Sequence, residues 1–257
     1  MESPPTEVGK KRGRGIFLLP NLFTTAALFA GFYGIVAAIN DRFAAAAAAI
    51  FIAMLLDGMD GRIARMTNTQ SAFGAEYDSL ADMVSFGLTP ALVAYEWVLQ
   101  SLGKLGWLAA FVYTSAAALR LARFNTQIGN ADKRYFQGLP SPAAAALIAG
   151  LVWVGHDYEM RAVGGTTIVA LALTIAAALL MVSNIRFYSF KEIDFRGRVP
   201  FVALLAVVLA FVFISLDPGS VLFGLFFTYA ASGPFLTLLQ VRQRRAAREA
   251  NIVDPEE

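Results

Sequence analysis

Eight apolar stretches occupy most of this chain, and they restrict it to one kind of fold. Crossing the hydrocarbon of a bilayer takes about 20 helical residues, within a range of about 17–25. The stretches approach or exceed this length, although the fifth is short and the last two lie close together. We therefore predict an all-α, polytopic membrane bundle of about eight transmembrane helices. The predicted spans are residues 20–39, 43–66, 78–99, 104–123, 139–155, 166–184, 199–216 and 219–240.

The composition agrees with a lipid environment. Hydrophobic residues make up 57% of the 257-residue chain and charged residues only 16%, whereas a soluble domain has about 25% charged residues. The absence of cysteine excludes a disulfide framework and thiolate chemistry. A net charge of +2 gives no reason to expect a nucleic-acid partner.

The basic residues fall mostly on one side of the predicted bundle. With eight spans both termini lie on the same side, and 18 of the 21 Lys and Arg residues fall there. The other side receives only Arg42, Lys104 and Arg161. An excess of Lys and Arg marks the cytoplasmic side. We therefore expect both termini in the cytoplasm. As a separate expectation, we place the protein in a bacterial inner membrane.

One membrane domain is expected, flanked by two polar tails on the cytoplasmic side. The tails cover residues 1–15 and 241–257, and the domain covers residues 16–240. The first apolar run opens with Pro20-Asn21 and is not followed by a small-residue cleavage motif. We interpret it as a span rather than a cleavable signal peptide.

Four aspartates gather at the facing ends of the second and third predicted spans. Asp57 and Asp60 are three positions apart, and Asp78 and Asp82 are four positions apart, so each pair lies on one face of its helix. An antiparallel hairpin of the two spans would bring all four carboxylates to a similar depth inside the cytoplasmic boundary. Ionisable residues inside apolar spans are costly and are functional candidates by default.

Four partly buried carboxylates repel one another, and a hard cation relieves this repulsion. Carboxylate oxygens suit Mg²⁺, Mn²⁺ and Ca²⁺, and the chain has no cysteine to favour a softer metal. We expect a divalent-metal site here, with two ions for the four carboxylates.

Small residues and one arginine accompany the aspartates. Gly58, Gly61 and Ala64 lie in the same predicted helix, and Gly74 precedes the second pair. Glycine in a helix costs about 1 kcal/mol relative to alanine, so these positions indicate close approach by a ligand or another helix. Helix packing is the alternative at Gly58 and Ala64. Because the planar fork of Arg65 matches an anionic oxygen, the set describes a site for a metal-bound diphosphate.

At these positions the chain resembles the CDP-alcohol phosphotransferases. The pattern is Asp57-x-x-Asp60-Gly61-x-x-Ala64-Arg65, eight residues, and Gly74-x-x-x-Asp78-x-x-x-Asp82, and it matches the signature of that family at every fixed position. Further segments are similar to the phosphatidylserine synthase branch, and they are Leu19–Thr24, Asp82–Pro90, Arg120–Asn125 and Phe136–Pro142. The resemblance covers the first five predicted spans.

The resemblance implies a homodimeric membrane enzyme that transfers a phosphatidyl group from CDP-diacylglycerol to L-serine and releases CMP. It implies that the four aspartates hold two Mg²⁺ or Mn²⁺ ions per protomer, and that Asp82 is also the general base. The CDP pocket would be formed by Asp57, Gly61, Ala64, Arg65, Gly74 and Asp78. No histidine, cysteine or activated serine at the site suggests a covalent intermediate, so we expect direct displacement.

The carboxylate of free serine requires a cation close to the metal site. Arg120 and Arg123, at the cytoplasmic end of the fourth span, are the candidates. Lys133 in the next loop and Ser85 are possible neighbours of this pocket. Anchoring at the membrane interface is the alternative role for the cations.

Two other functions are consistent with parts of the pattern. The same chemistry with glycerol phosphate or inositol phosphate as acceptor would favour a denser arginine cluster. A divalent-cation transporter would need polar groups through the whole membrane depth. Only Glu96 lies far along the third span, and the cores of the first and the fourth to eighth spans contain no acidic residue, which argues against transport.

Overall fold

The computed structural model describes residues 18–67, 69, 71–126, 135–160, 164–188 and 201–253. The helices are α1 (Leu18–Ile39), α2 (Phe43–Thr67), α3 (Ala72–Asp82), α4 (Thr89–Trp97), α5 (Lys104–Thr126), α6 (Ser141–Asp157), α7 (Gly165–Val182), α8 (Phe201–Leu216) and α9 (Pro218–Val253). A π-helix, η2 (Met83–Leu88), joins α3 to α4, and a 3₁₀ turn, η3 (Leu99–Leu102), follows α4. Two short strands are β1 (Tyr135–Gln137) and β2 (Arg186–Tyr188).

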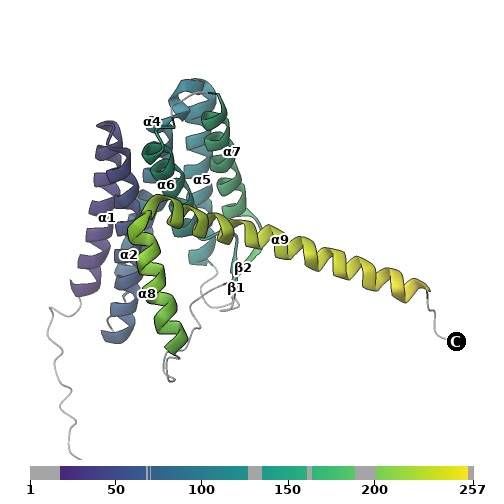
Figure 1. The fold of residues 1–257 in the computed structure, drawn as a ribbon. Coiled ribbons are helices and arrows are strands. Elements are labelled where there is room, and N and C mark those ends of the chain that lie inside the picture. The colour runs from purple at the N-terminus through teal and green to yellow at the C-terminus, as the bar shows by residue number, and fades with distance from the viewer. Residues whose placement is uncertain are drawn as a thin grey trace, which may run out of the picture.

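The predicted polytopic helical membrane fold is confirmed, but the count of eight crossings is not. Among the described residues, five helices are long and apolar enough to cross a bilayer: α1, α2, α5, α7 and residues Pro218–Leu239 of α9. Helix α6 has 17 residues and α8 has 16, and the third predicted span is divided between α3, η2 and α4. Figure 1 shows α1, α2 and α4 to α7 standing side by side as an upright bundle.

Small residues allow the first two helices to pack closely. Ala37 and Ala38 of α1 and Ala46 and Ala47 of α2 are all almost completely buried. At Gly31 of α1, an added Cβ would lie 2.6 Å from the Ser85 hydroxyl. Such interfaces of small residues are typical of membrane helices, because close backbone approach maximises van der Waals contact. Helix α1 therefore packs closely against η2, which is the middle part of the third predicted span.

The π-helix is stabilised by hydroxyl groups on both of its sides. Ser85 Oγ donates to the Ala27 carbonyl of α1 at 3.2 Å, and Thr89 Oγ1 donates to the Gly31 carbonyl at 3.0 Å. Tyr113 of α5 donates to the Phe86 carbonyl at 3.2 Å. A π-helical turn changes the register of the side chains that follow it and is often found next to functional sites. Here it directly follows Asp82.

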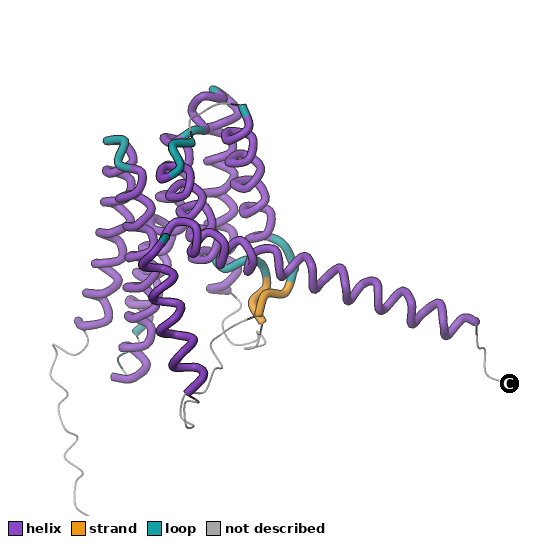
Figure 2. Tube along the Cα trace, viewed as in Figure 1, coloured by secondary structure: helices purple, strands orange, loops and turns teal. Residues whose placement is uncertain are grey.

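The two strands join chain segments that the sequence pattern assigned to loops. They pair antiparallel, with Tyr135 opposite Tyr188 and Gln137 opposite Arg186. Figure 2 shows this pair in orange at the end of the bundle where α5 ends and α6 begins. Gly138, with φ of 77°, follows β1, and an added Cβ there would collide with the Met181 carbonyl of α7. The pairing of β1 with β2 and the close contact at Gly138 therefore hold the end of α7 against the start of α6.

The last helix is longer than its predicted span. Residues 241–257 were expected to form a polar tail, but α9 continues through Val253. In Figure 1 it crosses the bundle and extends beyond it. Its first part packs on α6, where an added Cβ at Gly150 would lie 2.8 Å from Phe223 Cα.

Candidate functional site

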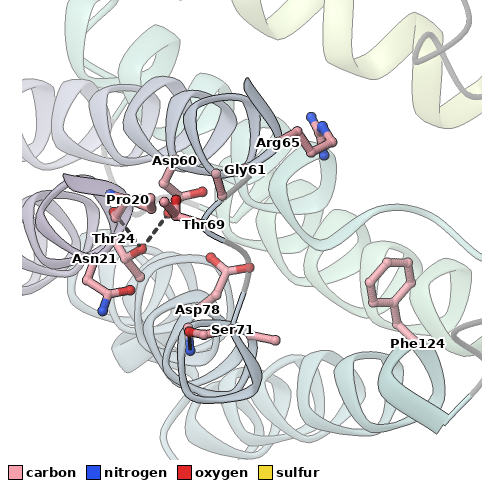
Figure 3. Close-up of a pocket in the computed structure, with 13 residues that line it drawn as sticks. Pro20, Asn21, Thr24, Asp60, Gly61, Arg65, Thr69, Ser71, Asp78 and Phe124 are labelled. Carbon is pink, nitrogen blue, oxygen red and sulfur yellow. Dashed lines mark hydrogen bonds between the residues drawn. The ribbon is translucent and has the colours of Figure 1, made fainter. Parts of the chain in front are cut away.

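A cavity of about 420 Å³ opens between α1, α2, α3 and the end of α5. This volume lies within the range of about 300–1,000 Å³ that is usual for small-molecule sites. Figure 3 shows the side chains that line the cavity. They are Pro20, Asn21, Thr24, Asp60, Gly61, Ala64, Arg65, Thr69, Ser71, Gly74, Ala75, Asp78 and Phe124.

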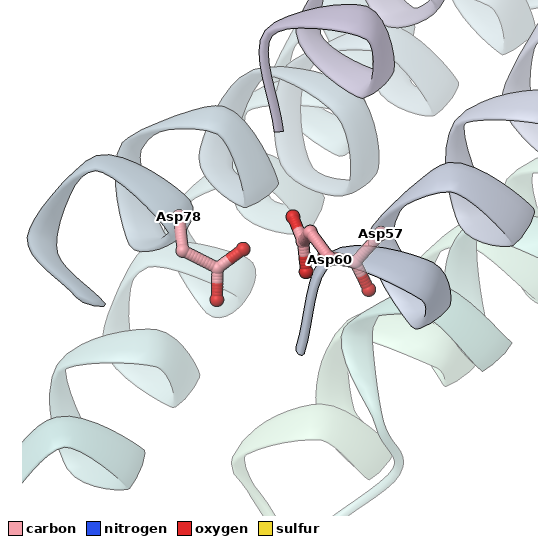
Figure 4. Close-up of side chains that lie close together, drawn as sticks. All are labelled: Asp57, Asp60 and Asp78. Atoms are coloured by element: carbon pink, nitrogen blue, oxygen red, sulfur yellow. The ribbon is translucent and has the colours of Figure 1, made fainter. Parts of the chain in front are cut away.

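Three of the four predicted aspartates meet beside this cavity. Carboxylate oxygens of Asp57, Asp60 and Asp78 all lie within 4.8 Å of one another, and Figure 4 shows Asp78 reaching from α3 towards the two acids of α2. Each acid offers one hard oxygen ligand at this spacing. The three carboxylates could therefore hold a divalent metal ion.

One carboxylate oxygen of this group of three aspartates has no hydrogen-bond partner among the described residues. This oxygen is the buried Asp78 Oδ1. An unpartnered buried carboxylate oxygen is costly, and a bound cation supplies the missing partner. The arrangement thus fits a hard divalent cation, in agreement with the chemistry of an all-oxygen site.

Asp60 is held by a threonine from the first helix. Thr24 Oγ1 donates to Asp60 Oδ2 at 2.7 Å, and the same hydroxyl lies 3.2 Å from the Pro20 carbonyl. Both Thr24 and Asp60 are buried. The start of α1 therefore forms one wall of the cavity and also orients one carboxylate of the cluster.

Asp82, the fourth predicted acid, lies one turn deeper on α3. It interacts electrostatically with Asp57, Asp78 and Arg120, but it is outside the group of three that shares the 4.8 Å spacing.

The predicted glycines differ in what surrounds them. An added Cβ at Gly74 would lie 3.1 Å from Ser71 Oγ and 3.4 Å from Asn21 Oδ1, so a side chain there would press on the cavity wall. An added Cβ at Gly58 would meet nothing within 4 Å, and one at Gly61 would meet only Arg65, at 3.7 Å. Within the described residues, Gly58 and Gly61 are therefore not required for helix packing.

Most of the predicted CDP contacts line the cavity. Gly61, Ala64, Arg65, Gly74 and Asp78 are all part of its wall, while Asp57 lies next to it in the carboxylate group. The structure thus brings together residues from the end of α2 and the start of α3, as the antiparallel hairpin predicted.

Three polar residues of the cavity were not predicted from the sequence: Thr24, Thr69 and Ser71. Thr24 lies in the segment Leu19–Thr24, whose likeness to other proteins was noted without a role for the threonine. Thr69 is buried and its hydroxyl lies 2.7 Å from that of Thr67. Ser71 caps α3 by accepting from the Gly74 N–H at 3.0 Å. No spacing pattern in the sequence marks Thr69 or Ser71.

The predicted cations of α5 occupy different surroundings. Arg120 Nη1 donates to Ser141 Oγ of α6 at 2.8 Å, and the positive charge of Arg120 acts electrostatically on Asp82. Arg123 Nη1 lies 3.4 Å from both the Ser183 carbonyl and Asn184 Oδ1, beyond the end of α7. Of the two, Arg120 therefore lies closer to the carboxylate cluster.

Ser85 and Lys133, the other two residues predicted near the serine pocket, are not seen at the cavity among the described residues. Ser85 is buried against α1, where its hydroxyl is used by the Ala27 carbonyl, and it does not line the cavity. Lys133 lies outside the described residues.

Comparison with known proteins shows the family of this chain. The family model for CDP-alcohol phosphatidyltransferase matches residues 17–182, which include α1 to α7. A CDP-diacylglycerol–serine O-phosphatidyltransferase of Helicobacter pylori is 38% identical over 214 residues, which are 83% of this chain and 90% of that protein. A protein of the same name from Mycobacterium leprae is 32% identical over 232 residues, which are 88% of this chain and 76% of that protein. Another from Saccharomyces cerevisiae is 37% identical over 139 residues, which are 49% of this chain and 50% of that protein. The chain belongs to the CDP-alcohol phosphatidyltransferase family.

Proposed function

We propose that this protein transfers the phosphatidyl group of CDP-diacylglycerol to L-serine, giving phosphatidylserine and CMP. The observation that carries the proposal is the group of Asp57, Asp60 and Asp78 within 4.8 Å, beside a cavity lined by Gly61, Arg65 and Gly74. The serine acceptor is supported by the relatives, which carry the name CDP-diacylglycerol–serine O-phosphatidyltransferase in bacteria and yeast.

The four aspartates would hold two Mg²⁺ or Mn²⁺ ions, and the buried Asp78 Oδ1, which has no hydrogen-bond partner among the described residues, would be one of the ligand atoms. Bound there, such ions supply neutralising charge to the diphosphate and to the CMP that leaves. Thr24 keeps Asp60 oriented through the 2.7 Å hydrogen bond, so the carboxylate does not need to reorganise when the substrate binds.

The residues of the cavity position the donor. The planar fork of Arg65 suits a diphosphate oxygen, and the absence of side chains at Gly61 and Gly74 lets the nucleotide approach the backbone. Phe124 lines the same cavity and offers an aromatic face. The acyl chains of the donor remain in the surrounding lipid, because the site is built on helices that span the membrane.

The reaction we propose is a direct displacement at the phosphorus on the lipid side of the diphosphate. The serine Oγ forms a bond to this phosphorus, the bond from phosphorus to the CMP oxygen breaks, and Asp82 accepts the proton of the serine hydroxyl. Arg120, whose charge acts electrostatically on Asp82, holds the serine carboxylate. Arg123 lies one turn further along α5 and adds positive charge to the same end.

We further propose that the site faces the cytoplasm of a bacterial inner membrane and that the enzyme is a homodimer. The orientation rests on the concentration of Lys and Arg residues on one side of the predicted spans. The cavity contains Arg65, which belongs to this basic side.

The decisive experiment measures CMP release by the purified protein in detergent, with CDP-diacylglycerol and Mn²⁺ or Mg²⁺, against a panel of alcohols. We expect L-serine to support release and glycerol 3-phosphate and inositol phosphate to support little. Release with one of the phosphorylated acceptors and none with serine would contradict the proposed acceptor while leaving the family chemistry intact.

A further inference from the structure

A side-chain bridge joins α3 to the end of α5. Asn125 Nδ2 donates to Ser79 Oγ at 2.9 Å, and the same hydroxyl lies 3.4 Å from Asn125 Oδ1. Ser79 Oγ also donates to the Ala75 carbonyl of its own helix at 3.1 Å. A hydroxyl has one hydrogen to donate and two lone pairs that accept, so it can use both contacts at once. The bridge therefore connects Asn125 to a hydroxyl that is itself anchored on α3.

The bridge lies beside residues of the candidate site on both helices. On α3, Ser79 follows Asp78, whose carboxylate belongs to the group of three acids. On α5, Asn125 follows Phe124, which lines the cavity together with Asp78 (Figure 3). Ser79 and Asn125 are both half-buried. The bridge therefore ties together two helices that each contribute side chains to the cavity wall.

The direction of the Asp78 side chain depends on the rotation of α3 about its own axis. With 3.6 residues per turn, neighbouring side chains point about 100° apart, so Ser79 can contact α5 while Asp78 reaches towards the acids of α2 (Figure 4). A side-chain atom about 5 Å from the helix axis moves by about 2 Å when the helix rotates by about 20°. An Mg²⁺–oxygen bond is itself only about 2.1 Å long. A metal site built from two helices therefore requires that the rotation of both is fixed.

The acids of the two helices are held in different ways. On α2, Asp60 receives a direct hydrogen bond from Thr24 at 2.7 Å. On α3, Asp78 Oδ1 has no hydrogen-bond partner among the described residues. The orientation of Asp78 therefore depends on how α3 itself is held, and the adjacent Ser79 supplies a contact that can hold it.

We propose that Ser79 and Asn125 are positioning residues, which fix the rotation of α3 and thereby hold Asp78 in place for a divalent metal ion. The proposal rests on the proposed function, in which the aspartates hold metal ions for the donor diphosphate. Neither Ser79 nor Asn125 needs to touch the metal or the substrates, because both act through α3. Loss of the bridge leaves every metal ligand present but less well placed, so the protein should require a higher metal concentration.

The test uses the purified whole chain in detergent and measures the Mn²⁺ concentration that gives half of the metal-dependent rise in melting temperature. In Ser79→Ala and in Asn125→Ala this concentration should rise about three- to tenfold, the change expected for the loss of one hydrogen bond. Ser79→Thr keeps a hydroxyl and should stay within twofold of wild type. Because both alanine variants break the same bridge, the double variant should show about the same rise as either one alone. The melting transition without metal shows that each variant is folded.

The matched control is Thr126→Ala, which removes the hydroxyl next to Asn125 that donates to the Arg123 carbonyl of its own helix at 3.0 Å. This variant should need the same Mn²⁺ concentration as wild type. Alanine variants within twofold of wild type, or a double variant whose rise equals the product of the two single rises, would overturn the positioning role. A wild-type protein with no Mn²⁺-dependent rise at all would instead contradict the metal site of the proposed function, so the two failures are distinguishable.

Discussion

Thr24 Oγ1 and Asp60 Oδ2 lie 2.7 Å apart, although 36 positions separate them in the chain. The hydrogen bond joins the start of α1 to the end of α2. It fixes the orientation of the Asp60 carboxylate, whose side chain is almost completely buried. Helix α1 is therefore part of the metal-binding arrangement even though it contributes no acid.

We expect Thr24→Val to lower kcat/KM for CMP release about ten- to a hundredfold, because a hydrogen bond to a charged group is worth about 1.5–3 kcal/mol. Valine keeps the shape of threonine but cannot donate. Thr24→Ser restores the donor and should restore most of the activity. The control is Thr25→Val, since the hydroxyl of Thr25 lies 2.9 Å from that of Tyr77, outside the cluster. Equal losses in both valine variants would show that the effect comes from α1 packing.

Asp78→Asn should abolish turnover without lowering the thermal stability of the protein in the absence of added metal. The substitution removes a proposed metal ligand, but it also removes one of three negative charges within 4.8 Å, which relieves repulsion. CMP release and the melting temperature in detergent test the two halves of this prediction. Glu76→Gln, at an exposed acid of the same helix, is the control and should keep full activity. Wild-type turnover by Asp78→Asn would refute the metal assignment.

Binding of Mn²⁺ or Mg²⁺ should stabilise the folded protein directly. A ligand at one hundred times its dissociation constant stabilises by about 2.7 kcal/mol, which is visible as a rise in melting temperature and is reversed by a chelator. In Asp57→Asn and Asp60→Asn this metal-dependent rise should shrink or disappear. A monovalent salt at matched ionic strength is the control. A rise of equal size in the variants and wild type would place the metal elsewhere.

The sequence predicted the parts of the site that depend on helical periodicity. The spacing predicted that the acids of α2, Asp57 and Asp60, and those of α3, Asp78 and Asp82, would come together across a helical hairpin. The structure places carboxylate oxygens of Asp57, Asp60 and Asp78 within 4.8 Å of one another. The glycines were selected because glycine is costly inside a helix, and Arg65 because its planar guanidinium matches anionic oxygens. Their placement required only that α2 and α3 form a hairpin.

Features that depend on contacts between distant residues could not be predicted. The π-helix after Asp82 depends on hydroxyl contacts to α1 and α5, such as that of Ser85 with Ala27. The strands pair residues about 50 positions apart, as in Phe136 with Phe187, and each has only three residues. Thr69 lines the cavity from a position between α2 and α3, where no helical periodicity applies.

The length of α9 also lay beyond the hydrophobic pattern. Hydropathy marks where a helix leaves the lipid, but it does not mark where the helix ends. Residues after Leu239 are polar and favourable for helix formation, with several alanines and arginines. The helix therefore continues to Val253 where a tail was expected.

The orientation of the protein can be tested by labelling, because the chain contains no cysteine. A single cysteine at Asp157, an exposed position at the end of α6, should react with an impermeant thiol reagent in intact cells. One at Arg242, an exposed position of α9, should react only after the membrane is permeabilised. Labelling of both positions in intact cells would contradict a cytoplasmic C-terminal end.

The two substrates should depend on different arginines. Arg65 lines the cavity, whereas Arg120 is hydrogen-bonded to Ser141 and is an electrostatic neighbour of Asp82. Arg120→Ala should therefore raise the KM for L-serine about ten- to a hundredfold, the loss expected for a charge-assisted hydrogen bond, and leave the KM for CDP-diacylglycerol nearly unchanged. Arg65→Ala should show the reverse pattern.

Lysine replacements sharpen this comparison, because lysine keeps the charge but not the planar fork. Arg120→Lys should recover only part of the serine affinity, since the bidentate edge is lost. Arg123→Ala provides the matched control on α5: its guanidinium is directed to Ser183 and Asn184, so its effect on the serine KM should be smaller. If Arg120→Ala weakens both substrates equally, Arg120 belongs to the donor site or to the scaffold. The serine carboxylate would then have to be bound by another cation.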